Sequence, residues 1–141
     1  MKKILIINGP NLNLLGKREP GIYGNKRFED YLAQLLHKFP QIQIDYFQTN
    51  HEGVIIDKLQ EADGKYNGVV LNPAAYTHTS IAIADCISAI AIPVVEVHIS
   101  DISKREKFRQ ISFVSPLAVK VIMGQGLAGY EQAVHFLANR E

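Results

Sequence analysis

The sequence predicts an α/β protein of the flavodoxin-like, doubly wound type, with a five-stranded parallel sheet and helices on both faces. Short apolar runs alternate with longer segments of helical periodicity, as expected when helices cross over between parallel strands. The first and third runs are almost continuously apolar, which is typical of strands covered on both faces. Five strands favour the doubly wound order over a closed barrel.

The expected strands are short and rich in Val and Ile. They lie at residues 4–7, 42–47, 69–71, 94–97 and 119–123.

The expected helices show apolar residues three and four positions apart. In the first, Phe28, Leu32 and Leu35 share one face while Glu29 and Asp30 turn outward. The four helical segments are 28–39, 54–62, 78–91 and 127–137.

The third helical segment is unusually apolar. Between Ile81 and Ile92 the only polar side chains are Asp85 and Ser88, and a helix apolar on nearly every side is expected to be buried on nearly every side. Either it is a central helix packed tightly on the sheet, or its outer face lies in a contact between subunits. The second interpretation predicts an oligomer.

Length and composition limit the classes of protein to which the chain can belong. The chain has 141 residues, 47% hydrophobic and 21% charged, with a net charge of +1. This predicts one domain spanning residues 1–141, with no nucleic-acid partner. No apolar run is long enough for a membrane span, the N-terminus does not resemble a signal peptide, and one cysteine, Cys86, fits a reducing compartment. We therefore expect a cytoplasmic protein.

Ligands of open parallel sheets bind beyond the carboxyl ends of the strands. Three polar segments follow strands here: residues 8–24, 72–80 and 96–101. They are expected to meet at one edge of the sheet.

The first of these segments is long for a connection between a strand and a helix. It contains Arg18 and Tyr23 among glycines and a proline. It is either a mobile lid from which both side chains point inward, or a solvated loop.

His98 ends a predicted strand, and Glu96 lies two residues earlier on the same strand face. A carboxylate so placed orients an imidazole and supports its use as a general acid. His78 either donates to a ligand hydroxyl or caps a turn. A zinc site built from His78, Glu96 and His98 is a weaker alternative, because the chain offers no helical pair of ligands.

Arg105 and Arg109 lie four residues apart, which would place them on one face of a short helical stretch. They either hold an acidic substrate or pair with Glu106.

Three segments together resemble the type II dehydroquinase family, and the resemblance covers essentially the whole chain. They are Ile-Asn-Gly-Pro-Asn-Leu at 7–12 with Arg-Glu-Pro at 18–20 and Tyr-Gly at 23–24, Asn-Pro-Ala-Ala-Tyr-Thr-His-Thr-Ser at 72–80, and Glu-Val-His-Ile-Ser at 96–100. The resemblance implies a flavodoxin-like lyase of the shikimate pathway that needs no cofactor or metal. It dehydrates 3-dehydroquinate to 3-dehydroshikimate through an enolate and assembles as a dodecamer, a tetramer of trimers.

The resemblance also implies roles for individual residues. Tyr23 would be the base, with its pKa lowered by Arg18, and Asn11 would hold the water that stabilises the enolate oxygen. His98, supported by Glu96, would protonate the departing hydroxyl. The substrate would be bound by Asn72 and the backbone of Ile99 and Ser100 at its carboxylate, by His78 and Arg109 at its ring hydroxyls, with Arg105 next to the lid and Asp85 reaching a neighbouring subunit's site.

Two departures from the family pattern leave the local loop geometry open. Asp101 stands where the family usually has Asn, and Ser103 and Lys104 replace a common His-Ala pair.

The main alternative is a flavodoxin-like binding or signalling module without catalytic activity. A phosphoacceptor module needs acidic residues after the first and third strands, where this chain has Asn8 and Asn72. A flavin module needs a phosphate-binding loop of Ser, Thr and Gly, which Asn-Gly-Pro-Asn at 8–11 matches poorly.

Overall fold

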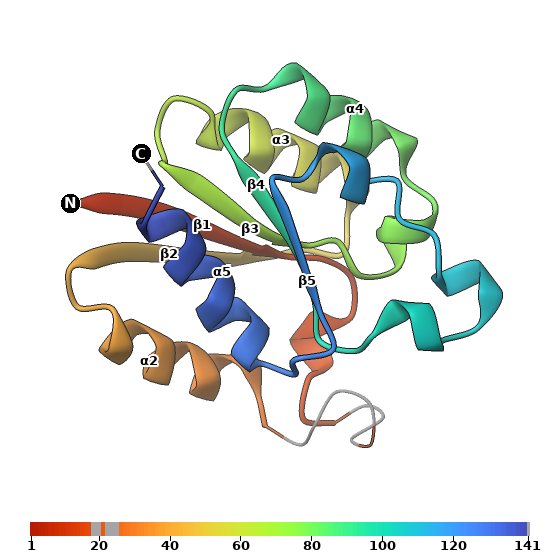
Figure 1. Ribbon diagram of the computed structural model, residues 1–141, viewed down its shortest axis with the longest axis horizontal. Helices are drawn as coiled ribbons and strands as arrows, with labels where there is room; N and C mark the ends of the chain where they lie inside the picture. Colours follow the sequence, from red (N-terminus) through yellow and green to blue (C-terminus); the bar gives the residue numbers. More distant parts are fainter. Residues whose placement is uncertain (18–20, 22–25, 141) are drawn as a thin grey trace.

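The computed structural model describes residues 1–17, 21 and 26–140. Its strands form a parallel sheet in the order β2-β1-β3-β4-β5 (Figure 1), which is the flavodoxin-like order. The predicted fold class is therefore confirmed. The strands are β1 (Lys2–Asn8), β2 (Ile42–Gln48), β3 (Gly68–Asn72), β4 (Val94–His98) and β5 (Lys120–Met123).

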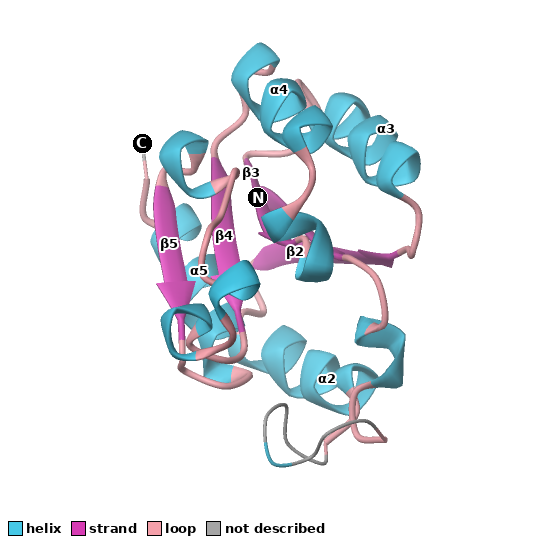
Figure 2. Ribbon diagram, turned by 90° about the vertical axis from the view of Figure 1, so that its right-hand side faces the viewer, coloured by secondary structure: helices cyan, strands magenta, loops and turns pink. Residues whose placement is uncertain are grey.

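In the described part of the chain, helices α2 (Phe28–Lys38), α3 (Glu52–Ala62), α4 (Ile81–Ala89) and α5 (Ala128–Ala138) cover the two faces of the sheet (Figures 1 and 2). Helices α2 and α5 pack on one face, and α3 and α4 pack on the other. Every residue of β3 and β4 is buried, because both strands lie inside the sheet with a hydrophobic layer above and below. None of the helices in the described part of the chain is long and apolar enough to cross a membrane.

The predicted helix at 78–91 is shorter than expected. A 3-10 turn, η2 (Ala74–His78), comes first, and α4 begins only after Ser80, whose hydroxyl caps the helix by accepting the N–H of Ile83 at 2.9 Å. At the other end, the N–H groups of Ala91 and Ile92 donate to the carboxylate of Asp63. They are thus turned away from helical partners.

Helix α4 is also less buried within the chain than its composition suggested. Ile83 and Ile87 face the sheet and are buried, whereas Ile81 is 58% exposed and Ala82 and Ala89 are exposed. The interpretation of a central helix covered on nearly every side within one chain is therefore wrong.

The expectation that Arg105 and Arg109 share one short helix is wrong as well. They lie in two separate 3-10 turns, at the end of η3 (Ile102–Lys104) and in η4 (Lys107–Arg109), and Arg105 itself is extended with φ −91° and ψ −175°. The Asp101 carboxylate caps the start of the first turn by accepting the N–H of Ser103 at 3.0 Å, and the extended backbone of Arg105 separates this turn from the next.

The carboxyl ends of β1 and β3 lie in close contact. Asn8 pairs with Asn72 across the two strands, and the N–H of Gly9 donates to the carbonyl of Asn72 at 2.8 Å. A Cβ atom at Gly9 would lie 2.7 Å from the carbonyl oxygen of Pro73, so a side chain there would separate the two loops. This contact brings two of the three polar segments to one edge of the sheet.

Candidate active site

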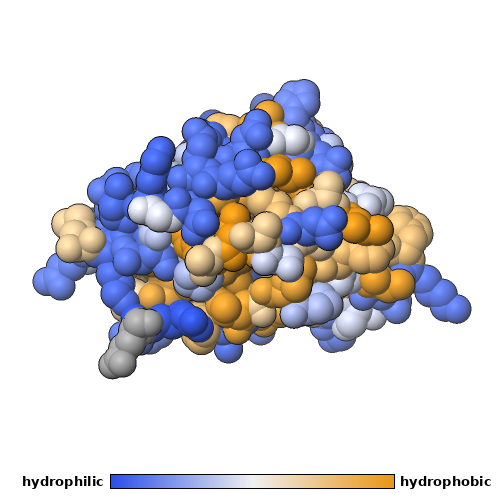
Figure 3. All heavy atoms as spheres, turned by 90° about the horizontal axis from the view of Figure 1, so that it is seen from above, coloured by the Kyte–Doolittle hydropathy of each residue, from blue (hydrophilic) through white to orange (hydrophobic). Residues whose placement is uncertain are grey.

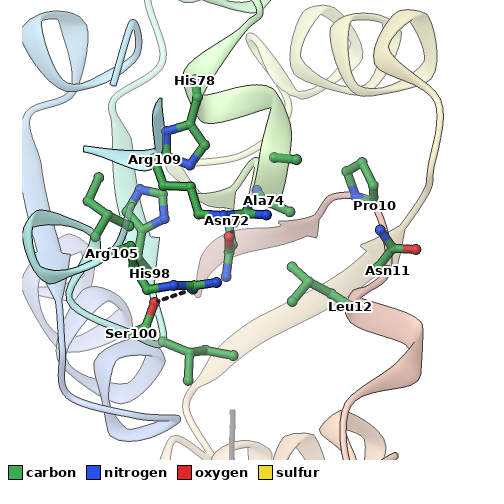
Figure 4. A pocket seen from close by; sticks show the side chains of 13 residues that line it. Pro10, Asn11, Leu12, Asn72, Ala74, His78, His98, Ser100, Arg105 and Arg109 are labelled. Atoms are coloured by element: carbon green, nitrogen blue, oxygen red, sulfur yellow. Dashed lines mark hydrogen bonds between the residues drawn. The ribbon is translucent and has the colours of Figure 1, made fainter. Parts of the chain in front are cut away.

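A pocket opens beyond the carboxyl ends of β1, β3 and β4 (Figure 4). Histidines and arginines lie on one side of it, the loop after β1 lies opposite, and Asn72 lies between them. Among the described residues, the lining carries positive charge and no carboxylate, which suits an anionic ligand. The lining residues are Pro10, Asn11, Leu12, Asn72, Ala74, Ala75, His78, His98, Ile99, Ser100, Ile102, Arg105 and Arg109.

Most of the residues singled out from the sequence line this pocket, two described ones do not, and two lie outside the described residues. Glu96 lies behind His98. Asp85 is exposed on α4 and is not among the lining residues. Arg18 and Tyr23 lie outside the described residues.

The imidazole of His98 is held from behind by Glu96. Both side chains are buried, and His98 Nε2 bonds to Glu96 Oε2. A carboxylate only accepts hydrogen bonds, so Nε2 carries the hydrogen. Nδ1 makes no hydrogen bond to the described residues and remains for a ligand.

Glu96 is kept ionised by more than His98. Burial alone would raise the pKa of the Glu96 carboxyl, but His98 and the hydroxyls of Ser115 and Ser112 together hold it below its ordinary value. Ser115 Oγ donates to Oε1 at 2.6 Å and Ser112 Oγ donates to Oε2 at 2.8 Å. The carboxylate therefore keeps its negative charge against the imidazole.

His78 offers the pocket an acceptor and not the donor considered from the sequence. Its Nδ1 lies 2.8 Å from the carbonyl oxygen of Ile111, and a carbonyl can only accept. Partial burial lowers the pKa of His78, so the ring is neutral near pH 7. The hydrogen therefore sits on Nδ1, and Nε2 is left to accept one from a ligand hydroxyl.

The three histidine and glutamate side chains considered for zinc do not form a metal site. In the described part of the chain, no cluster of three or more His, Cys, Asp or Glu side chains is placed to hold a metal ion.

The two arginines both line the pocket and both lie close to Glu106. Arg109 Nε donates to Glu106 Oε2 at 3.2 Å, and Arg105 Nε lies 3.7 Å from Glu106 Oε1. Arg105 Nη1 also donates to Ser100 Oγ at 3.2 Å. The alternatives of holding a ligand and pairing with Glu106 are thus compatible, because Glu106 orients guanidinium groups that still face the pocket.

The amide of Asn72 is buried at the base of the pocket, with 3% of the residue exposed. Its Oδ1 accepts the N–H of Ala74 at 3.1 Å, and its Nδ2 donates to the hydroxyl of Tyr130 at 2.9 Å. One amide hydrogen remains without an acceptor among the described residues, so it is available to a ligand.

Backbone conformations shape the opposite walls. Asn11 has φ 68° and Ala74 has φ 53°, a region that non-glycine residues enter infrequently. At Asn11 the N–H donates to Asn50 Oδ1 at 3.0 Å. At Ala74 the N–H donates to Asn72 Oδ1, so hydrogen bonds hold both strained residues at the pocket.

The departures at Asp101, Ser103 and Lys104 leave the turn well formed. Asp101 Oδ1 accepts from both the N–H and the hydroxyl of Ser103, at 3.0 and 2.6 Å, so the two replacements support each other.

Ser112, Ser115 and Tyr130 were not identified as part of the site from the sequence. The serines follow no strand, and Tyr130 occupies an apolar position in a helical pattern. The sequence did contain one signal for these donors: Glu96 lies within a buried strand, and a buried carboxylate requires hydrogen-bond donors.

Comparisons with known proteins identify the family of the chain. Residues 2–138 match the model of the family described as Dehydroquinase class II. A 3-dehydroquinate dehydratase of Clostridium botulinum is 54% identical over 141 residues, which covers 99% of this chain and 96% of the relative.

Two solved structures are similar over nearly their whole length. The type II dehydroquinase of Butyrivibrio crossotus superposes with a TM-score of 0.92 at 48% identity, covering 98% of each chain. That of Propionibacterium acnes gives 0.94 at 42% identity, covering 99% of this chain and 98% of the other. A family match of this extent, with relatives this similar, shows that the chain belongs to the class II dehydroquinase family.

Proposed function

We propose that the pocket beyond β1, β3 and β4 is where this dehydroquinase removes water from 3-dehydroquinate to form 3-dehydroshikimate, a step of the shikimate pathway. The observation that carries the proposal is the convergence of a paired acid, His98 with Glu96, and an anion-binding set, Asn72 with Arg105 and Arg109, in one pocket. The substrate is a small carboxylate with several hydroxyls and needs both.

The carboxylate of the substrate is bound at the base of the pocket. Asn72 donates its remaining amide hydrogen to the carboxylate. The backbone of Ile99 and Ser100 binds the carboxylate from the opposite side. The carbonyls of Ile99 and Ser100 accept the N–H groups of Gly126 and Gly124 at 3.1 Å, which fixes this wall to the turn after β5.

The ring hydroxyls are bound at the rim. Arg109 donates hydrogen bonds from its guanidinium, and His78 accepts one at Nε2. Arg105 lies beside Ser100 and adds positive charge near the carboxylate. Donors and an acceptor together fix the orientation of a ring that carries more than one hydroxyl.

The reaction begins with removal of the proton alpha to the ketone. Tyr23 acts as the base in its phenolate form, which the guanidinium of Arg18 stabilises. The electron pair of the broken C–H bond forms an enolate, and a water held by Asn11 donates to the enolate oxygen.

His98 completes the elimination. When its ring is protonated on both nitrogens, Nδ1 gives its proton to the hydroxyl on the beta carbon as the C–O bond breaks. The carbonyl re-forms, a carbon–carbon double bond conjugated with it appears, and water leaves. His98 is left neutral with its hydrogen on Nε2, still bonded to Glu96.

The proposal is tested by adding 3-dehydroquinate to the purified protein and following the ultraviolet absorbance of the conjugated enone. Tyr23→Phe is expected to abolish both dehydration and exchange of the alpha proton with deuterated solvent, with binding kept in calorimetry. An enone signal at the wild-type rate in Tyr23→Phe would remove Tyr23 as the base.

We also propose that the chain assembles as a dodecamer, a tetramer of trimers. Seen from above, hydrophobic residues gather over the part of the surface on which α4 lies (Figure 3). Ile81 is among the large exposed apolar residues, and Asp85 lies on the same helix with an exposed side chain. A neighbouring subunit covering this face would bring Asp85 toward that neighbour's pocket.

The site is proposed to belong to one catalytic domain, residues 1–141, that acts in the cytoplasm. All the pocket residues in the described part of the chain come from one sheet and its connections. Cys86 is a free buried thiol, which fits a reducing compartment.

A further inference from the structure

The direction of the Asn72 amide is set by a backbone group. The N–H of Ala74 can only donate, so the atom of Asn72 that faces it at 3.1 Å must be Oδ1. The amide nitrogen then faces the hydroxyl of Tyr130 at 2.9 Å. Because an amide nitrogen only donates, Tyr130 must accept this hydrogen bond.

The hydroxyl of Tyr130 continues the chain of hydrogen bonds in the same donor-to-acceptor direction. Its own hydrogen is free to donate, and it does so to Asn8 Oδ1 at 2.7 Å. Asn8 Nδ2 in turn donates to the hydroxyl of Tyr46 at 3.4 Å. The chain Asn72–Tyr130–Asn8–Tyr46, buried as far as Asn8, therefore has one consistent polarity, which begins at the pocket.

The Tyr130 oxygen has little freedom to move. Tyr130 is 0% exposed, and its ring meets Phe28 edge-on, with centroids 4.9 Å apart and an interplanar angle of 70°. Burial raises the pKa of Tyr130, so the group stays a neutral phenol, which both donates and accepts. Tyr130 itself does not line the pocket.

We propose that Tyr130 is a positioning residue for the substrate carboxylate. By taking up one hydrogen of the Asn72 amide, it holds the second hydrogen toward the pocket. This inference rests on the proposed function, because it assigns the carboxylate as the group that Asn72 binds. Without the Tyr130 hydroxyl, the N–H of Ala74 is the one hydrogen-bond partner left to the amide among the described residues.

Tyr130→Phe tests the proposal because it removes one oxygen and keeps the ring. The KM for 3-dehydroquinate is expected to rise roughly 3- to 10-fold, about the effect of one hydrogen bond, while kcat changes less than about 2-fold, as expected for loss of uniform binding. Tyr66→Phe is the matched control, since its hydroxyl bonds to Asp45 away from the pocket. The control is expected to keep the wild-type KM.

The double variant separates positioning from a general loss of structure. In an Asn72→Ala background, adding Tyr130→Phe should leave KM unchanged, because the residue through which Tyr130 acts is gone. An equal rise of KM in both backgrounds, or a fall of kcat with KM unchanged, would overturn the proposal. Wild-type turnover is measured in the same series, so failure of the proposed function appears separately, as wild-type protein that produces no enone.

If Tyr130→Phe does not fold, the side-chain amide protons of Asn72 in the wild-type protein test the proposal. In nuclear magnetic resonance spectra with 3-dehydroquinate or its product present, one side-chain amide proton of Asn72 should shift strongly and the other, bonded to Tyr130, should shift little. Equal shifts of both protons, or of neither, would contradict the assigned direction.

Discussion

Glu96 and His98 lie two residues apart on β4, and the carboxylate of one accepts the ring hydrogen of the other where both side chains are buried. The alternation of side chains along a strand places them on the same face. Two serines from the segment before β5 complete the shell around the carboxylate. A buried, ionised carboxylate against an imidazole is the arrangement that a general acid requires.

Replacing Glu96 by Gln is expected to lower kcat by about 10- to 100-fold, within the range of general acid catalysis. The amide keeps the size of the side chain but removes the charge that stabilises the protonated ring. Steady-state kinetics give kcat and KM, and Glu52→Gln, an acid at the start of α3 that does not line the pocket, is the control. An unchanged kcat in Glu96→Gln would mean that the charge does not matter for His98.

The lowered pKa of Glu96 also predicts how stability depends on pH. Because its folded pKa lies below the ordinary value, the folded chain binds fewer protons than the unfolded chain between the two values, so stability falls as pH falls. The contribution is complete above the ordinary glutamate pKa of about 4.3. It is lost as pH drops through the folded pKa.

Urea unfolding between about pH 3 and pH 6 measures this contribution. The difference in unfolding free energy between wild type and Glu96→Gln is expected to shrink toward low pH. The difference between wild type and the double variant Ser112→Ala, Ser115→Ala should also shrink toward low pH. Parallel curves for wild type and Glu96→Gln would contradict the depressed pKa.

Arg109 is expected to act on binding. Arg109→Ala should raise the KM for 3-dehydroquinate by about 10-fold or more, because a charge-assisted hydrogen bond to the ligand is lost. Lys107→Ala is the matched control: it removes an exposed cation from the same turn η4 without changing the pocket lining. Equal KM values for the two variants would show that only the net charge of the turn matters.

The exposed face of α4 predicts the effect of charge on assembly. Ile81→Glu places a carboxylate where Ile81 is now 58% exposed, and burying an unpaired charge in a subunit contact is unfavourable. Light scattering should show a dodecamer for wild type and smaller species for Ile81→Glu.

Leu36→Glu on α2 is the control for that experiment, since Leu36 is 42% exposed on the opposite layer of the molecule. It should leave the assembly intact. A wild-type protein that is monomeric at micromolar concentration would contradict the interpretation of α4.

The fold could be predicted from the sequence because its signals are local. The apolar runs of β1 and β3 are buried on both faces, and the periodic residues Phe28 and Leu35 face the core. The end of α4 could not be predicted, because it depends on Asp63, a residue from the end of α3 that binds the N–H groups of Ala91 and Ile92.

The pocket residues that follow a strand could be predicted because ligands of open parallel sheets bind beyond the carboxyl ends of the strands. The positions of Asn72 and His98 follow from where β3 and β4 end. Ser112, Ser115 and Tyr130 could not be found, because their roles depend on contacts across 16, 19 and 58 positions of the chain. Such distant pairings leave no periodic signal.

The central claim, that His98 is the acid of this pocket, is tested most directly by the rate of enone formation from 3-dehydroquinate in His98→Ala, with binding checked by calorimetry. The account predicts a loss of at least about 100-fold in turnover, with the substrate still bound and its alpha proton still exchanging with deuterated solvent. Turnover near the wild-type rate would contradict it, because His78, the other imidazole among the described lining residues, holds its hydrogen toward Ile111 and offers the pocket an acceptor.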